Sequence, residues 1–355
     1  MGLRAAVERR VRFGEESRDR WGGFLKCASW FYEGAVRLRN RYYDQGLGLR
    51  KLPAPVLSVG NLTVGGTGKT PLVMLLASRL REKGLKVTVL SRGHRRSKTS
   101  EVMQVSAGQG STVSIRAAGD EPYMMAQKLE GVSVWVGADR FRVGMAAWEK
   151  APPDLFLLDD GFQHRRLGRD VDFLVARLPR PFGNKKLLPA GPLREPLSSL
   201  RRAHMVVLTG QKSIETHAEW IQVANHIPVV RAFLKAKALR PAEGRESYPL
   251  EFLQGKRAAL VCAVGHPKGF QEMVRLLGAE SGPCLFFPDH HWYTPQDISR
   301  IKNMARDAEV VITTEKDIWK LKETGLQLPG LMVLEMEMEM EDRGILETFL
   351  NCLLV

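Results

Sequence analysis

Short apolar runs alternate with segments of helical periodicity along most of this chain. In the first 226 residues, strands are expected at residues 56–59, 86–90, 132–136, 155–158, 171–176 and 205–208. An apolar helix is expected from Pro71 to about Lys83, where Gly84 ends it. Strands that alternate with helices favour a mostly parallel sheet with helices on both faces. The pattern therefore predicts an α/β fold.

A second, smaller α/β lobe is expected in the last third of the chain. Strands with helices between them are predicted at residues 257–264, 284–287, 310–313 and 331–336. Before them, residues 227–240 are extended and basic in character, and the chain is rich in Pro and Glu through residue 249. The predicted organisation is an N-terminal amphipathic segment (1–50), a main domain (51–226), a linker (227–250) and a C-terminal lobe (251–355).

One segment near the N-terminus has a different pattern. Between residues 21 and 38, aromatic and aliphatic side chains recur at helical spacing, and basic residues stand between and after them up to Arg41. This pattern indicates an amphipathic helix with aromatic residues on one face and a basic end. Two interpretations are open: a helix packed on the protein's own core, or a helix that lies in a membrane interface.

Composition and charge narrow the class of protein. The chain has 355 residues, 44% of them hydrophobic, and a formal net charge of +14. This charge favours anionic partners such as nucleotide phosphates, nucleic acid or an acidic membrane surface. The four cysteines are scattered without a C-x-x-C pair, which argues against a zinc site or disulfide framework. We find neither a secretory signal nor an apolar run of the ~20 residues that a spanning helix needs.

The segment TVGGTGKTP contains the strongest chemical motif. A phosphate-binding loop needs backbone N–H groups near the phosphate oxygens, a Lys for the β/γ-phosphates and a hydroxyl for Mg²⁺. A predicted strand precedes the segment and a predicted helix follows it. In the usual G-x-x-x-x-G-K-[ST] spacing the first Gly would stand at position 63, where this chain has Thr63. The predicted nucleotide-binding residues are Thr63, Val64, Gly65, Gly66, Thr67, Gly68, Lys69 and Thr70.

A second motif supports a Mg–nucleotide site. Such sites place an Asp at the end of an apolar strand, close to the loop hydroxyl. The run LFLLDD supplies Asp159 and Asp160. An apolar run that ends in Asp is common by itself, but its pairing with GTGKT in one α/β pattern is specific. The two motifs together predict a P-loop NTPase-like domain.

A P-loop does not distinguish a kinase from other nucleotide-using proteins. Thr314-Glu315-Lys316-Asp317 superficially resembles a guanine-reading segment, but Glu315 occupies an extra polar position. The repeats of basic and aromatic residues expected of a nucleic-acid motor are not found, so nucleic acid is not an expected partner. Two functions that remain open at this point are a P-loop ATPase acting on nucleic acid and a soluble small-metabolite kinase.

Several separated motifs resemble the tetraacyldisaccharide 4′-kinases, the lipid A 4′-kinases. They are SVGNLTVGGTGKTP (58–71), SRG (91–93), GDEP (119–122), DDGFQHRRLGRD (159–170), LPAGPLREP (188–196), PDHHWYT (288–294) and TTEKD (313–317). The resemblance covers roughly residues 20–320. The number and the order of these motifs support the resemblance more than any single motif does.

The resemblance implies a specific reaction and location. It implies transfer of the ATP γ-phosphate to the 4′-hydroxyl of a tetraacylated disaccharide 1-phosphate, which gives lipid IVA in lipid A (lipopolysaccharide) biosynthesis. The expected cofactors are ATP and Mg²⁺. The expected place is the cytoplasmic face of the bacterial inner membrane, peripheral or monotopic, with residues 21–41 on the anionic surface. The expected fold has two α/β lobes with the active site in the cleft.

The resemblance also suggests catalytic residues. An Asp–His dyad would activate the sugar hydroxyl, and it maps to Asp120 of GDEP and His290 of the PDH segment. Without the family, Asp120 could equally cap a helix that begins at Glu121. His290 and His291 are adjacent, so spacing cannot decide between them, and we choose His290.

Cations and metal ligands complete the predicted site. Arg140 and Arg194 would join Lys69 around the transferred phosphoryl group, although an exposed surface position is the commoner fate of Arg. For Mg²⁺ and its water shell, the candidates are Thr70, Asp159, Asp160 and Glu195. Gln163 and His164 either position metal or phosphate or help to fold the turn after the strand.

Overall fold

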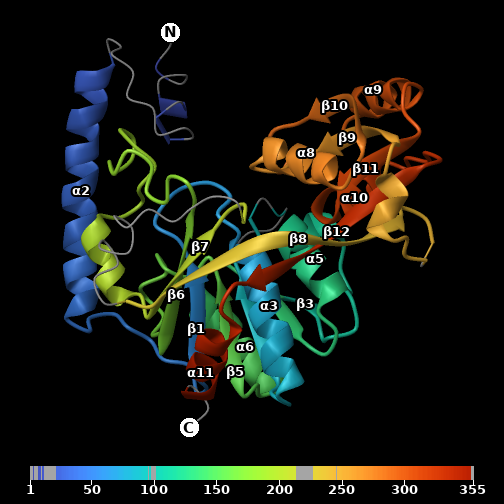
Figure 1. Ribbon diagram of the computed structural model, residues 1–355. Helices are drawn as coiled ribbons and strands as arrows, with labels where there is room; N and C mark the ends of the chain where they lie inside the picture. The colour runs from blue at the N-terminus through green and yellow to red at the C-terminus, as the bar shows by residue number, and fades with distance from the viewer. Residues whose placement is uncertain are drawn as a thin grey trace.

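The computed structural model describes residues 21–94, 96, 101–212, 227–244 and 246–352, with residues 3, 7, 8, 10 and 11. Most of the first twenty residues of the predicted N-terminal segment, and residues 213–226 of the predicted main domain, lie outside this set. The described chain forms two α/β lobes joined by a long strand pair (Figure 1).

One sheet runs through both lobes, in the order β10-β9-β11-β12-β8-β7-β6-β1-β5-β2-β4-β3. Its strands are β1 (Val56–Gly60), β2 (Val87–Ser91), β3 (Met103–Ser106), β4 (Ser133–Val136), β5 (Leu155–Asp159), β6 (Val171–Arg177), β7 (Met205–Thr209), β8 (Val229–Pro241), β9 (Arg257–Cys262), β10 (Glu280–Phe286), β11 (Val310–Thr314) and β12 (Leu331–Met340). Neighbouring strands are parallel except for the pairs β12–β8 and β3–β4. The predicted mostly parallel α/β sheet is thus confirmed.

The helices cover both faces of the sheet. They are α2 (Gly22–Asp44), α3 (Lys69–Glu82), α4 (Ile115–Ala118), α5 (Asp120–Lys128), α6 (Arg140–Lys150), α8 (Pro267–Leu276), α9 (Pro295–Ala305), α10 (Glu315–Glu323) and α11 (Arg343–Cys352), with the 3₁₀ helices η1 (Leu197–Arg202) and η2 (Leu250–Leu253). On β5, Leu157 packs in the core cluster that contains α3, and Phe156 packs in the one that contains α6. Because side chains alternate along a strand, a strand buried on both faces is apolar throughout.

The strand pair β8–β12 connects the lobes. Residues 229–232 of β8 pair parallel with β7, and residues 232–241 pair antiparallel with β12. The segment predicted as a linker therefore contains a 13-residue strand that continues the sheet. Arg and Lys interrupt its apolar residues, so the sequence lacks the longer apolar run by which the other strands were predicted. A further strand, β3, is also absent from the predictions.

The end of the chain returns to the first lobe. Leu346 and Leu350 of α11 belong to the same core cluster as Leu72 and Leu76 of α3. Lys83 forms a 2.7 Å ion pair with Glu347. The prediction placed this helix with the C-terminal lobe, whereas its apolar face packs on the P-loop lobe.

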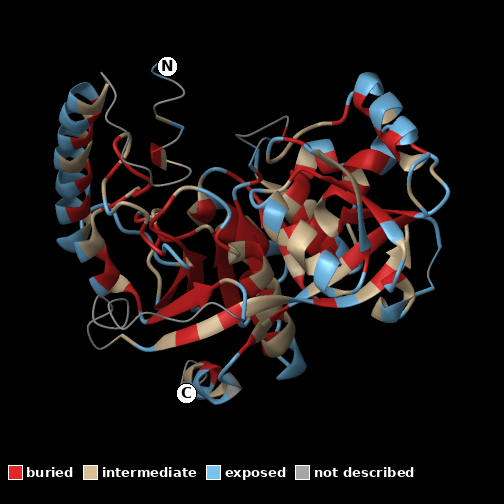
Figure 2. Cartoon of the chain, turned by 45° about the horizontal axis from the view of Figure 1, so that its top comes forward, coloured by how far each residue is buried: buried red, intermediate tan, exposed pale blue. Residues whose placement is uncertain are grey.

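Helix α2 runs along the outside of the first lobe (Figure 1). Leu25 and Val36 are buried, and Ser29 and Asn40 of the same face bond to Leu187 and Glu195. The opposite face is exposed (Figure 2), with Trp30 and Phe31 each 71% exposed. Within the described residues, no helix is both long and apolar enough to span a bilayer.

Candidate active site

The phosphate-loop segment lies between β1 and α3, as the motif predicts. Helix α3 begins at Lys69, and its N-cap, Gly68, has a φ of 91° and no side-chain cap. Gly65 has a φ of 109°, and a Cβ there would meet no atom within 4 Å. The uncapped N–H groups and the open space beside them form a cradle for an anion.

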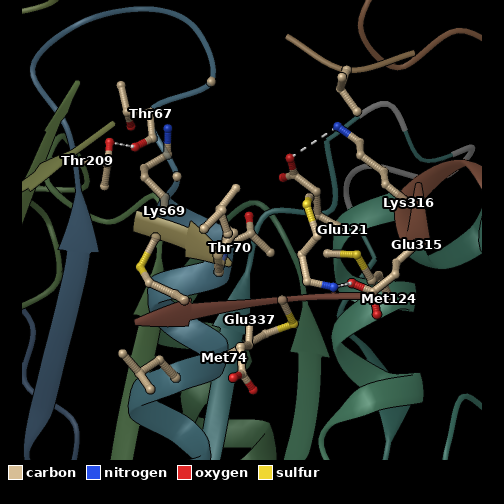
Figure 3. A pocket seen from close by; sticks show the side chains of 18 of the residues that line it. Thr67, Lys69, Thr70, Met74, Glu121, Met124, Thr209, Glu315, Lys316 and Glu337 are labelled. Atoms are coloured by element: carbon tan, nitrogen blue, oxygen red, sulfur yellow. Dashed lines mark hydrogen bonds and ion pairs between the residues drawn. The ribbon is translucent and has the colours of Figure 1, made fainter. Parts of the chain in front are cut away.

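Neighbouring strands hold this loop in place. Thr209, at the end of β7, donates a 2.6 Å hydrogen bond from its hydroxyl to the carbonyl of Thr67. Asn61 donates from its amide to the Thr67 hydroxyl at 3.1 Å. These bonds fix the loop backbone while Lys69 and Thr70 stand at the start of α3 (Figure 3).

The two carboxylates after β5 differ in environment. Burial, followed by the charges of Glu121 and Asp160, raises the pKa of Asp159 to about 7. Burial also opposes ionisation of Asp160, but Lys69 and Arg194 outweigh it and lower the pKa of Asp160 to about 2. Lys69 lies 3.5 Å from Asp160, and Arg194 lies 3.2 Å from it. The pair therefore meets the loop lysine at the end of the sheet.

Asp120 and His290 come together from the two lobes. The Nδ1 atom of His290 lies 2.9 Å from both carboxylate oxygens of Asp120. Burial alone would raise the pKa of Asp120, but the His290 hydrogen bond and the charges of Lys316 and Lys320 lower it strongly. The capping interpretation of Asp120 is wrong: Asp120 is the first residue of α5, the N-cap is Gly119 without a side-chain cap, and the carboxylate of Asp120 bonds to His290.

His291 has different partners. Its Nε2 atom lies 2.9 Å from Asp297 of α9, and its ring stacks on Phe287. His290 instead borders the central cavity, with a φ of 62° that turns the chain toward α5. The left-handed backbone, which sequence spacing could not reveal, separates the two histidines.

A single cavity of about 1200 Å³ joins these parts. Residues 65–71 of the phosphate loop line it from one side, and His290, Asp289 and Lys316 line it from the C-terminal lobe. Asp159, Asp160 and Arg194 lie on its wall as well. A nucleotide on the loop and a second substrate beside His290 could thus share one cavity.

Similarity to known proteins identifies the family of this chain. A family model described as tetraacyldisaccharide-1-P 4′-kinase matches residues 21–354. This chain belongs to that family. The tetraacyldisaccharide 4′-kinase of Geobacter sulfurreducens is 40% identical over 336 residues, which cover 93% of each chain. The one of Syntrophus aciditrophicus is 39% identical over 321 residues, which cover 86% of each.

A solved member of the tetraacyldisaccharide 4′-kinase family has the same fold. The crystal structure of LpxK from Aquifex aeolicus in complex with ATP matches with a TM-score of 0.76 at 35% identity. The match covers 94% of this chain and 99% of that chain. The P-loop kinase fold predicted from the sequence is therefore the fold of this family.

The structure corrects the first positions assigned to the nucleotide in this 4′-kinase family member. Thr63 is buried and forms a β-bridge with Leu193, and the N–H of Val64 donates to the carbonyl of Pro192 at 2.9 Å. The backbone of Thr63 and Val64 is therefore engaged by residues 192 and 193 of the protein itself. The part of the loop that lines the cavity begins at Gly65, which explains why position 63 does not need a glycine.

Glu195 was predicted as a magnesium ligand, but it does not line the cavity. Its fully buried carboxylate pairs with Arg39 at 3.3 Å and Arg202 at 3.0 Å. Asn40 and Ser199 donate further hydrogen bonds to it. With its oxygens taken by these donors, Glu195 ties α2 to the loop before η1 and is not a metal candidate.

Gln163 and His164 contact other parts of the protein and not the cavity. Gln163 donates to the carbonyl of Asn61 at 2.8 Å and accepts from Arg194 at 3.3 Å, so it braces the phosphate loop against Arg194. Burial, followed by the charge of Arg140, lowers the pKa of His164 to about 4. Neither residue is among the described residues that line the cavity.

Arg140 and Arg194 differ in access to the cavity. Arg194 lines it. Arg140 is buried at the start of α6 and donates to the carbonyl of Ala138 at 2.8 Å. Burial, and then the positive charge of Arg92, lower the pKa of Arg140 to about 10. The negative charges of Asp160 and Asp159 act in the opposite direction. Arg140 therefore acts on the acidic pair through its charge.

Lys316 is the main site residue that the sequence analysis did not assign. Its ammonium group lies 3.3 Å from Nε2 of His290 and 3.1 Å from Asp289. The TTEKD motif was the available signal, since it resembles both a guanine-reading segment and a motif of the 4′-kinases, but neither resemblance assigned a role to its lysine.

Proposed function

We propose that this protein transfers the γ-phosphate of ATP to the 4′-hydroxyl of a tetraacylated disaccharide 1-phosphate, forming lipid IVA. One observation carries the proposal: the phosphate loop and His290, which is bonded to Asp120, border the same cavity from different lobes. Membership of the tetraacyldisaccharide-1-P 4′-kinase family identifies the acceptor class.

The donor side consists of residues 65–70. Their backbone N–H groups and Lys69 would hold the nucleotide phosphates, because an uncapped helix N-terminus and a nearby ammonium group both favour negative charge. Gly65 and Gly68 adopt positive φ angles that other residues rarely reach, and the open space beside Gly65 would let phosphates approach the backbone.

The residues of this site fit a magnesium ion. Thr70, Asp159 and Asp160 offer a hydroxyl and two carboxylates, and Mg²⁺ in nucleotide sites is typically bound by one or two carboxylates together with phosphate oxygens and water. Burial and then the negative charges of Glu121 and Asp160 raise the pKa of Asp159, and a divalent cation would offset both effects. When bound, Mg²⁺ would neutralise charge on the phosphates. Among the described residues, no group of three or more His, Cys, Asp or Glu side chains is placed to hold a metal ion.

Asp120 and His290 supply the base. A neutral imidazole that donates Nδ1–H to a buried carboxylate presents the lone pair of Nε2, and the carboxylate stabilises the imidazolium that forms. His290 faces the cavity and Asp120 lies behind it. The pair would therefore accept the proton of the sugar hydroxyl as one unit.

Cationic side chains that are already in position would stabilise the negative charge on the transferred phosphoryl group. Lys69 and Arg194 are each paired to Asp160, which orients them toward the loop. Such preorganised charges stabilise a transition state without further reorganisation.

The acceptor is an amphiphile, and α2 offers a surface that suits a bilayer. Exposed aromatic residues, among them Trp30 and Phe31, stand on the face that α2 turns away from the protein. Aromatic rings favour the membrane interface, and the net charge of +14 favours anionic lipid. We place the protein on the cytoplasmic face of the inner membrane, held there by residues 21–41.

The test is acceptor-dependent ATP turnover by purified protein in detergent. ADP should form when the tetraacylated disaccharide 1-phosphate is added with Mg–ATP, and single-stranded or duplex nucleic acid should not replace the lipid. Turnover stimulated by nucleic acid but not by the lipid would contradict the proposal and favour a nucleic-acid ATPase.

A further inference from the structure

Lys316 stands at the meeting point of the two lobes. Its ammonium group lies 3.1 Å from Asp289 of the C-terminal lobe and 3.4 Å from Glu121 of α5 in the P-loop lobe. Figure 3 shows Lys316 reaching from α10 toward Glu121. Its side chain is only 13% exposed, so these charges meet with little water between them.

The start of α10 fixes this position. Thr314 caps the helix: the N–H of Asp317 donates to its hydroxyl, and that hydroxyl donates to the Asp317 carboxylate at 2.8 Å. Lys316 and Lys320 are four residues apart and so share a helix face. Lys320 is fully buried, 3.0 Å from Asp317 and 3.6 Å from Asp120. The helix therefore presents two ammonium groups to the carboxylate of Asp120.

Lys316 also lies 3.3 Å from Nε2 of His290. An ammonium group has donors and no acceptor, so in this contact Nε2 must be the acceptor. The proton of a neutral imidazole then resides on Nδ1, which faces Asp120 at 2.9 Å. The contact thus selects the tautomer whose Nε2 lone pair faces the cavity.

We propose that Lys316 is a positioning residue for phosphoryl transfer, which holds His290 in the Nδ1–H tautomer and keeps the Asp120–His290 pair unprotonated. This inference rests on the proposed function. The incoming hydroxyl replaces Lys316 as the donor to Nε2, while Glu121 and Asp289 retain the ammonium group beside it. One positive charge close to the pair disfavours a second proton on it.

In the described part of the chain, charged groups from three segments face the pair. From α5 it meets Glu121, from α10 it meets Lys316 and Lys320, and from its own segment Asp289. The ring of His94 lies 5.5 Å from that of His290. Within the described residues, loss of Lys316 removes one of the two lysines that face Asp120 and leaves the carboxylates, so the pair should bind a proton more tightly.

A purely structural role would give a different result. Arg116 also joins the lobes, with a 3.0 Å ion pair to Glu323 of α10 and its guanidinium over the ring of Trp292. It lies outside the residues that line the cavity. Arg116→Met is therefore a matched control that weakens the contact between lobes and leaves His290 untouched.

The experiment compares Lys316→Met, Lys316→Arg and Arg116→Met in the lipid phosphorylation assay across pH. For Lys316→Met we expect kcat to fall about 10- to 100-fold, as for loss of efficient proton transfer. The acid limb of the profile should move up by about one pH unit, equivalent to tenfold tighter proton binding. Lys316→Arg keeps the charge and should restore the limb. An acid limb that stays in place for Lys316→Met, or that shifts equally for Arg116→Met, overturns the proposal.

A second measurement does not depend on turnover. Nitrogen NMR of histidine-labelled wild-type protein, with His290→Gln to assign the signal, reports which ring nitrogen carries the proton. We expect the proton on Nδ1 at neutral pH, and a proton on Nε2 overturns the proposal. If the lipid is not phosphorylated but Nδ1 is protonated, the proposed function fails while the arrangement around Lys316 stands.

Discussion

Asp159 and Asp160 are adjacent in sequence, but the protein raises the pKa of the first and lowers the pKa of the second. The strand carries Asp159 into the protein, where Ser91 donates to it at 2.9 Å, whereas Asp160, with a φ of 49°, turns toward Lys69. A motif predicts that both belong to the site. It cannot predict which of them stays ionised, because that depends on neighbours from other strands and helices.

The raised pKa of Asp159 predicts a pH-dependent cost to stability. In the folded protein this carboxyl holds its proton up to about pH 7, against 3.8 for its ordinary value. Between these values the folded state binds more protons than the unfolded state, so the free energy of unfolding falls as pH rises. Without nucleotide or metal, Asp159→Asn should melt several degrees above wild type at pH 8. Near pH 4 the two should melt alike, and a pH-independent difference would contradict this explanation.

Asp120→Asn separates chemistry from nucleotide binding. The amide keeps the size of the side chain, but it cannot stabilise a charged imidazole as a carboxylate does. We expect kcat to fall roughly 10²–10⁴-fold. ATP affinity, measured by calorimetry, should be nearly unchanged because Asp120 lies outside the phosphate loop. A variant with full turnover would remove Asp120 from the mechanism.

At the scale of elements, α2 shows what periodicity can and cannot predict. The spacing correctly indicated an amphipathic helix, although the helix extends to Asp44. It did not show that Phe31 faces outward while Leu25 and Val36 face the protein, because both sets recur at helical spacing. The packed face is held partly by polar contacts, such as Tyr32 to the carbonyl of Arg194 at 2.9 Å. Neither interpretation of the segment was complete: one face packs on the protein and the other is exposed.

The exposed face of α2 predicts membrane affinity. Trp30→Ser with Phe31→Ser should weaken binding to anionic vesicles at least tenfold, since roughly 1.5–3 kcal/mol is associated with burying one large apolar side chain. Flotation with phosphatidylglycerol vesicles measures it. Leu276→Ser is the control, because Leu276 is 70% exposed on α8 of the other lobe. Equal loss in both variants would contradict a role specific to α2.

At the scale of the whole molecule, the strands of each lobe were predictable and their connection was not. Apolar runs such as residues 155–158 identify buried parallel strands. Strand β8 is only partly buried along much of its length and carries charged residues such as Lys235, which pairs with Glu339 of β12. Its strand character comes from its partner on β12, about a hundred residues later. For the same reason the contact between Asp120 and His290, 170 residues apart, depended on the family resemblance.

Nucleotide should stabilise the molecule through the phosphate loop. Mg–ATP at 100 times its Kd should add about 2.7 kcal/mol to the free energy of unfolding, which a thermal shift detects. Lys69→Met should lose most of this gain because the phosphates lose their ammonium partner. If nucleotide stabilises wild type and variant equally, it binds elsewhere.

The central claim is that the two lobes assemble one site for transfer of phosphate to a lipid-linked sugar hydroxyl. The most direct test incubates the purified protein with γ-³²P-ATP and tetraacylated disaccharide 1-phosphate, then isolates the lipid and locates the label. The account predicts a bisphosphorylated lipid labelled on the 4′-oxygen, formed by wild type and hardly formed by Asp120→Asn. Lipid that stays unlabelled while the protein binds Mg–ATP, or label at another position, would contradict it.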